Sequence, residues 1–276
     1  MNATVSPEAY KGFQHFLEDS CGIVLGDNRH YLVSSRLHRV MQENKLDSLD
    51  ELLSRLRRSP NSGLRELVID AMTTNETFWF RDGYPFDVLK SRIYPELARL
   101  GRGPLRVWSA ACSSGQEAYS ISITTQEWRT TNPGALPADV QIIGTDISPS
   151  VLRQAKDGRY DEAAIRRGVS TERQQRYFRK ADDEWEVRPE IKARAAFREA
   201  NLLGNYSLLG RFDVIFCRNV LIYFSNDLKR DIIGRMAKVL NPGGYLFLGS
   251  SESISAHSDA FEMVRCNPGV VYRLRG

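Results

Sequence analysis

The sequence predicts an α/β protein with a small all-helical domain over residues 1–72 and a larger sheet domain over residues 105–276. Three observations predict this fold. Only helical periodicities occur up to residue 72, strand patterns alternate with helical ones from residue 105 onward, and residues 157–195 interrupt the alternation. Strands that alternate with helices form a parallel sheet with helices on its faces. Residues 157–195 are therefore expected to form a small antiparallel β-subdomain inserted in the sheet domain.

The composition is typical of a soluble globular protein, because 42% of the 276 residues are hydrophobic and 26% are charged. The net charge of +4 is too small to indicate nucleic-acid binding by itself. No apolar run approaches the roughly 18 residues of a membrane-spanning helix, and the start of the chain has no signal-peptide pattern. We expect a cytosolic protein that does not insert into membranes.

The cysteines and histidines show no metal or disulfide signature. The cysteines lie far apart without a CxxC pair, and no histidines form a close ligand pair. We therefore expect free thiols and no bound metal. The cysteines are Cys21, Cys112, Cys217 and Cys266.

The helical domain carries a group of arginines on one predicted helix. Over residues 28–41, apolar residues at helical spacing form a core face, and Arg29, Arg36 and Arg39 lie together beside it. An arginine stripe is either an ordinary solvated face or a surface for an acidic partner. The pattern by itself leaves both interpretations open.

Residues 73–104 are predicted to be a linker and a connecting helix. The linker begins with the polar run Thr73–Thr77 and continues with three aromatic residues and Arg81. Packing at a domain junction does not require two threonines, an asparagine and an arginine, so we expect this segment to face a ligand. Helical patterning then runs from Val88 to Leu97 and stops at Gly101.

Five strands and three helices are predicted in the sheet domain. The connections at the carboxyl ends of parallel strands form the ligand crevice of such sheets. The strands are Arg106–Trp108, Val140–Gly144, Ala196–Glu199, Phe212–Cys217 and Tyr245–Gly249, and the helices are Gln116–Arg129, Ser148–Lys156 and Asp227–Val239. Within the insertion, Lys180–Val187 is predicted to be a hairpin with an acidic tip.

The turn after the first strand indicates a nucleotide-like cofactor. Small residues from Ser109 to Gly115 let a backbone approach a ligand, and the following helix N-terminus offers free amides, although an ordinary α/β turn has the same pattern. A nicotinamide cofactor would require several glycines at its pyrophosphate, and this turn contains one. S-adenosylmethionine has no phosphate. Its ammonium, ribose and adenine suit Glu117, Asp146 and Asn201, although Asp146 also fits an ordinary helix N-cap.

Four ordered motifs resemble the CheR family, bacterial chemotaxis methyltransferases that methylate glutamates on chemoreceptors. The motifs are TTNETFWFR at 73–81, RVWSAACSSGQEAYS at 106–120, TDI at 145–147 and FCRNVLIYF at 216–224. The resemblance extends over almost the whole chain, from Gly22 to Glu252. It implies a Rossmann-like, S-adenosylmethionine-dependent methyltransferase domain behind a helical receptor-recognition domain.

The resemblance also implies roles for individual residues. Tyr223 is the catalytic residue nearest the sulfonium, and Arg36 and Arg39 belong to the helix that contacts the receptor, an acidic helical coiled coil. An arginine near the transferred methyl is left unassigned, because the spacing does not place Arg92 there. The cofactor-binding residues implied are Asn75, Thr77, Arg81 and Glu117 at the methionyl end, Asp146 at the ribose, Asn201 and Leu202 at the adenine, and Arg218 and Asn219 along the cavity.

The predicted function is methylation of chemoreceptor glutamates, which gives methyl esters and S-adenosylhomocysteine for chemotaxis adaptation, by a monomer. Glutamate is ionised at neutral pH, so no strong base is needed. Family members that tether to a receptor pentapeptide have a glycine in the hairpin, and residues 180–184 have none, so we expect no such tether. The alternatives are a nucleic-acid methyltransferase and a non-catalytic adaptor that senses S-adenosylmethionine.

Overall fold

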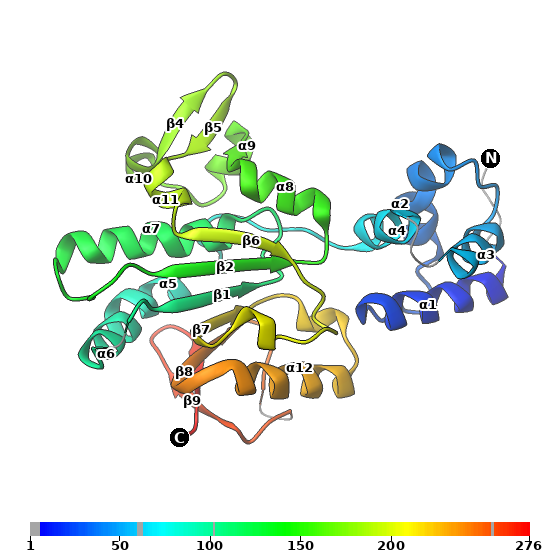
Figure 1. Cartoon of the computed structure of the whole chain (residues 1–276). Helices are drawn as coiled ribbons and strands as arrows, with labels where there is room; N and C mark the ends of the chain where they lie inside the picture. The colour runs from blue at the N-terminus through cyan, green and yellow to red at the C-terminus, as the bar shows by residue number, and fades with distance from the viewer. Residues whose placement is uncertain (1–5, 60–62, 102, 255–256) are drawn as a thin grey trace.

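The computed structural model describes residues 6–59, 63–101, 103–254 and 257–276 (Figure 1). A helical N-terminal domain lies beside the sheet domain, and the small inserted subdomain projects from another side of the sheet domain (Figure 1). Among the described residues, no helix combines the length and apolar character needed to cross a membrane.

The described residues of the N-terminal domain form four helices around one apolar core that includes Phe13, Leu17, Leu37 and Leu52. Polar caps begin two of the helices, since the Ser6 and Ser48 hydroxyls accept amide hydrogen bonds there. The helices are α1 (Pro7–Cys21), α2 (His30–Glu43), α3 (Leu49–Arg58) and α4 (Gly63–Met72).

The connecting helix is not regular along its length. It consists of α5 (Tyr84–Val88), a π-helical turn (Leu89–Ile93) and α6 (Tyr94–Arg99), where the sequence predicted one continuous helix. Pro95 lacks the amide hydrogen that would continue the α pattern to Ser91. This segment packs with α7 on one face of the main sheet.

The main sheet has seven strands in the order β6-β2-β1-β7-β8-β10-β9. The first five of these are parallel, and the last two are antiparallel to their neighbours. The strands are β1 (Arg106–Ala110), β2 (Gln141–Asp146), β6 (Ala195–Glu199), β7 (Phe212–Cys217), β8 (Leu240–Leu248), β9 (Phe261–Arg265) and β10 (Val270–Leu274).

Two of these strands were missed at the sequence level, and one begins earlier than predicted. β9 and β10 form the antiparallel edge after the predicted elements end, and β8 starts at Leu240 rather than Tyr245. Alternate residues along the strands enter two cores. Val107 and Phe216 face α7 (Gln116–Thr131), whereas Trp108 and Ile215 face the side of α12 (Asn226–Val239).

The insertion is a small three-stranded antiparallel sheet with short helices, as the sequence predicted. Asp182 takes a positive φ of 56° in the turn of the hairpin. The elements are α8 (Pro149–Asp157), which leads into the insertion, β3 (Arg159–Tyr160), α9 (Glu162–Arg166), α10 (Thr171–Tyr177), β4 (Phe178–Ala181), β5 (Glu184–Val187) and α11 (Pro189–Lys192). Within the described residues, the chain also forms two 3-10 turns, at Ser207–Leu209 and Leu221–Tyr223.

Candidate active site

A cavity of about 520 Å³ lies between the N-terminal domain and the carboxyl edge of the main sheet. Its volume is in the range of small-molecule sites. Residues after the ends of β1, β2, β6 and β7 line one side, and residues of α1, α2 and the linker line the other. The cavity therefore exists only because the two domains face each other.

Strained backbone surrounds this cavity. Ala111, Ser113 and Asn219 line it and have φ values of 57°, 51° and 60°, a left-handed conformation that is uncommon for residues other than glycine. Such strain gathers at functional sites, where the surrounding structure holds it. Gly115 is also left-handed, with a φ of 93°, and a Cβ there would lie 2.9 Å from the Cβ of Ala155, so this glycine also permits close packing of α7 against α8.

Glu117 presents a largely buried carboxylate from the first turn of α7. Its Oε1 accepts a hydrogen bond from the Ser109 hydroxyl at 2.7 Å, and its Oε2 accepts one from Arg218 at 3.1 Å. Burial raises the pKa of Glu117, although Arg218 and Ser109 oppose that shift. A cationic ligand group would be favoured next to this carboxylate.

Asp146 closes β2 with a second buried carboxylate. Oδ2 accepts from the Ser113 amide at 2.8 Å, and Oδ1 accepts from the Ser148 amide at 3.0 Å. Burial raises its pKa, against the effect of these amides. The N-cap of α8 is Ser148 rather than Asp146, because the Ser148 hydroxyl accepts from the Val151 amide. The N-cap alternative for Asp146 is thereby excluded.

Arg218 connects Glu117 to a residue that the sequence did not single out, Asp82. Only 1% of the Arg218 side chain is exposed, and it contacts the Asp82 carboxylate at 2.5 Å and the Arg81 carbonyl at 3.0 Å. Asp82 also has a positive φ, of 68°. The acidic residue beside Arg81 was visible in the sequence, but nothing there connected it to Arg218.

A second missed residue, Glu252, shapes the turn after β7. Its Oε2 accepts from the amides of Asn219 and Gly249, each at 2.7 Å, and its Oε1 accepts from Ile222 at 3.2 Å. This turn leads to Tyr223, which lines the cavity and is half-buried. The Tyr223 carbonyl accepts from the Val24 amide at 2.9 Å, so the N-terminal domain contacts this turn directly.

The linker residues Asn75, Thr77 and Arg81 all line the cavity, as expected for a ligand-facing segment. The carbonyl of Asn75 accepts from the Ser113 hydroxyl at 2.9 Å, which joins the linker to the turn after β1. Arg81 donates to the Glu76 carbonyl at 3.2 Å.

Asn201 and Leu202 line the cavity beyond β6. The Asn201 amide donates to the Ser20 carbonyl at 2.7 Å, and its oxygen accepts from Leu203, so this side chain also joins the two domains. Arg92 is not among the lining residues and pairs with Glu96 at 3.1 Å.

The arginines of the N-terminal domain occupy different environments. Arg29 and Arg36 line the cavity, whereas the exposed Arg39 pairs with Glu43 at 2.7 Å. Arg36 is half-buried and donates to the carbonyls of Met72 and Thr73 and to the hydroxyl of Thr74. The predicted pair Arg36 and Arg39 is therefore split between the domain junction and the surface.

Two buried polar atoms beside the cavity lack a hydrogen-bond partner within the described residues, Nε of Arg218 and Oδ1 of Asn219. One is a donor and the other an acceptor, and buried polar groups normally have partners. With the carboxylates of Glu117 and Asp146, they fit a ligand that carries an ammonium, a carboxylate and hydroxyls, which are the groups of S-adenosylmethionine. No cluster of potential metal ligands occurs in the part of the chain that the structure describes.

Comparison with known proteins gives matches over nearly the whole chain. A model described as CheR methyltransferase, SAM binding domain matches residues 75–270, and one described as CheR methyltransferase, all-alpha domain matches residues 8–73. Chemotaxis protein methyltransferase 1 of Pseudomonas aeruginosa is 55% identical over 265 residues, which cover 95% of this chain and 96% of the relative. Chemotaxis protein methyltransferase Cher2 of Pseudomonas putida is 52% identical, with 96% and 98% covered. The chemotaxis protein methyltransferase of Salmonella typhimurium is 38% identical, with 85% and 80% covered.

Proposed function

The chain belongs to the CheR family of S-adenosylmethionine-dependent chemotaxis methyltransferases, and from that premise we propose that it methylates glutamate side chains of chemoreceptors. The products are glutamate methyl esters and S-adenosylhomocysteine, and the reaction adjusts receptor signalling during chemotaxis adaptation. One observation carries this proposal. The same cavity is lined by carboxylates at the sheet edge and by arginines of the N-terminal domain.

The carboxylates at the sheet edge suit the cationic cofactor, and the arginines of the N-terminal domain suit the anionic glutamate of the receptor. S-adenosylmethionine supplies an activated methyl group on a positively charged sulfur. We assign its ammonium to Glu117 and its ribose hydroxyls to Asp146, since both carboxylates are largely buried and keep unused lone pairs. All seven of the remaining predicted residues line the same cavity, and we assign Asn75, Thr77 and Arg81 to the methionyl end, Arg218 and Asn219 to the space beside it, and Asn201 and Leu202 to the adenine.

An anionic glutamate side chain would enter from the side of Arg29 and Arg36, where positive charge favours it. The carboxylate is already ionised at neutral pH, so the chain needs no base to activate it. Tyr223, half-buried in the wall of the cavity, would orient the carboxylate through its hydroxyl. Positioning and exclusion of water would then supply most of the rate, an effect of roughly 7–11 kcal/mol in well-oriented systems.

The direct test is transfer of radiolabelled methyl to membranes that contain chemoreceptors. We expect label on the receptor that is released by mild base, because methyl esters hydrolyse to methanol under conditions that leave methyl groups attached to amines and nucleobases. Membranes without receptors are the control. Base-stable label, or label on nucleic acid, would contradict the proposal.

A further inference from the structure

The inserted subdomain holds the linker that borders the cavity. The Trp79 amide donates to the Arg167 carbonyl at 3.1 Å. The fully buried indole of Trp79 packs in T-shaped geometry against the rings of Tyr160 and Phe178, at centroid distances of 4.9 and 5.0 Å. Residues of the insertion thus contact both the backbone and the side chain of the linker.

Gly168 makes this contact possible. Its φ is +110°, and a Cβ at this position would lie 2.0 Å from the carbonyl oxygen of Trp79. A side chain there would force the insertion and the linker apart. The loop between α9 and α10 is therefore shaped to fit against the linker backbone.

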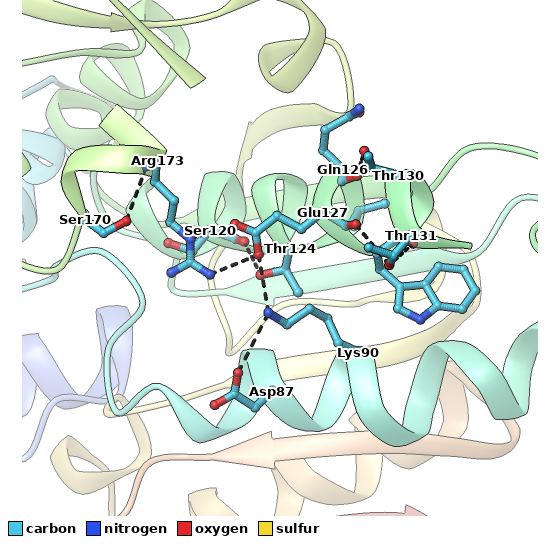
Figure 2. A network of polar contacts seen from close by, with 12 residues as sticks. Asp87, Lys90, Ser120, Thr124, Gln126, Glu127, Thr130, Thr131, Ser170 and Arg173 are labelled. Carbon is cyan, nitrogen blue, oxygen red and sulfur yellow. Dashed lines mark hydrogen bonds and ion pairs between the residues drawn. The ribbon is translucent and has the colours of Figure 1, made fainter. Parts of the chain in front are cut away.

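Arg173 on α10 covers the next linker residue. Its guanidinium carbon lies 3.8 Å from the ring centroid of Phe80. The same guanidinium donates through two nitrogens to the Glu127 carboxylate on α7, at 2.7 and 3.0 Å, and Lys90 donates to that carboxylate at 3.3 Å (Figure 2). Only 24% of the Arg173 side chain and 20% of the Glu127 side chain are exposed. The pKa of Glu127 is lowered, since the effects of Arg173 and Lys90 together outweigh the opposing effect of burial.

Phe80 occupies a strained position between this contact and the cavity. It has a φ of 50°, and its amide donates to the Ser120 hydroxyl at 3.0 Å. The following residues, Arg81 and Asp82, are those whose carbonyl and carboxylate hold Arg218 against Glu117. A bulky residue keeps a positive φ only where its surroundings hold it.

We propose that Arg173 and Glu127 are positioning residues for cofactor binding: their ion pair holds Phe80 in place and thereby sets Arg81, Asp82 and Arg218 at the methionyl end of the cavity. Neither residue lines the cavity, so any effect on the cofactor passes through the linker. The inserted subdomain then has a function that does not depend on a receptor tether. The inference concerns cofactor binding and stands whichever side chain accepts the methyl group.

The test measures S-adenosylhomocysteine binding to the full chain by calorimetry. We expect Arg173→Ala to raise the dissociation constant about tenfold and Glu127→Gln to raise it by roughly threefold or more. Arg194→Ala is the matched control. Arg194 donates to Asp139 through one nitrogen at 2.8 and 2.9 Å and to Gln126 on helix α7, the helix that also carries Glu127. Its other side-chain hydrogen bond goes to the Glu190 carbonyl, and none goes to the linker among the residues that the structure describes. We expect Arg194→Ala to change the constant by less than about twofold.

A second readout needs no ligand. Hydrogen exchange of the linker peptide that contains the amides of Trp79 and Phe80 should accelerate in Arg173→Ala and Glu127→Gln, and stay unchanged in Arg194→Ala. The proposal is overturned if either folded variant raises the dissociation constant by less than roughly threefold. It is also overturned if Arg194→Ala raises that constant as much as Arg173→Ala or Glu127→Gln does. Should Arg173→Ala not fold, Glu127→Gln decides alone, because it keeps the shape of the side chain and removes its charge.

Discussion

Arg218 donates to the Glu117 carboxylate at 3.1 Å inside the cavity, although the two residues lie on different elements, after β7 and at the start of α7. The pair fixes one oxygen of Glu117, and Ser109 fixes the other. Glu117 is thus oriented before any ligand arrives, which reduces the cost of binding.

Glu117→Gln is expected to weaken binding of S-adenosylhomocysteine about tenfold or more at neutral pH, because it removes the charge of the carboxylate that we assign to the ammonium. Since burial raises the pKa of Glu117, wild-type affinity should start to fall on acidification at a higher pH than an exposed glutamate would give. As pH decreases through this pKa the carboxyl becomes neutral, and the attraction is lost. Calorimetry across pH measures both effects. The assignment is contradicted if Glu117→Gln leaves the pH profile of binding the same as that of wild type.

Asp146→Asn is expected to lower both cofactor affinity and thermal stability. Its amide nitrogen would face the Ser113 or Ser148 amide, which needs an acceptor. Asp213→Asn is the matched control, because Asp213 is buried and accepts from the Arg106 amide at 2.9 Å away from the cavity. Asp213→Asn should lower the melting temperature and leave cofactor affinity unchanged. Equal loss of affinity in both variants would show that Asp146 has only a structural role.

Tyr223→Phe is expected to lower turnover by roughly tenfold or more while S-adenosylhomocysteine binding changes little, because the hydroxyl would act on the acceptor carboxylate. Tyr94→Phe removes a buried hydroxyl that contacts Thr125 at 2.7 Å outside the cavity, and it should leave turnover unchanged. Single-turnover methylation and calorimetry separate the two quantities. Parallel loss of turnover and affinity in Tyr223→Phe would refute the assigned role.

Arg39→Ala and Arg36→Ala are expected to differ. Arg39 is exposed and pairs with Glu43 on its own helix, so its loss should raise the KM for receptor and spare cofactor binding. Arg36 donates to the carbonyls of Met72 and Thr73, where the linker begins. Its loss should therefore weaken both receptor binding and cofactor binding. Methylation kinetics at varied receptor and varied cofactor concentrations separate the two effects. Identical changes in Arg39→Ala and Arg36→Ala would contradict this expectation.

A receptor-type pentapeptide, Asn-Trp-Glu-Thr-Phe, is expected not to bind. The hairpin turn contains Asp182 and no glycine, and Arg159 on β3 pairs with Asp182 at 3.1 Å and with Glu184 at 2.9 Å. Calorimetry should detect no association tighter than roughly 100 µM. A dissociation constant in the micromolar range would overturn this expectation.

Local sequence patterns determined most of the sheet domain. Every strand and helix predicted there occurs, because strands buried on both faces are continuous apolar runs, as in Phe212–Cys217. The antiparallel strands β9 and β10 were missed. Phe261–Arg265 exposes several residues and ends at the edge of the sheet, so its pattern differs little from that of a loop. The π-helical turn at Leu89–Ile93 was also missed, because the apolar spacing there still resembles an α-helix.

The sequence alone identified Asp146, Asn201 and Arg218 as residues of the cavity, because each lies at or just after the end of a strand, and these strand ends meet at one edge of the sheet. Only the tertiary structure decided their partners. Arg218 meets Asp82 across 136 residues, and Asp146 accepts amides from both of its neighbouring turns. Arg173 reaches Phe80 from an inserted subdomain. Contacts between distant segments depend on how whole elements pack, and no local periodicity encodes that packing.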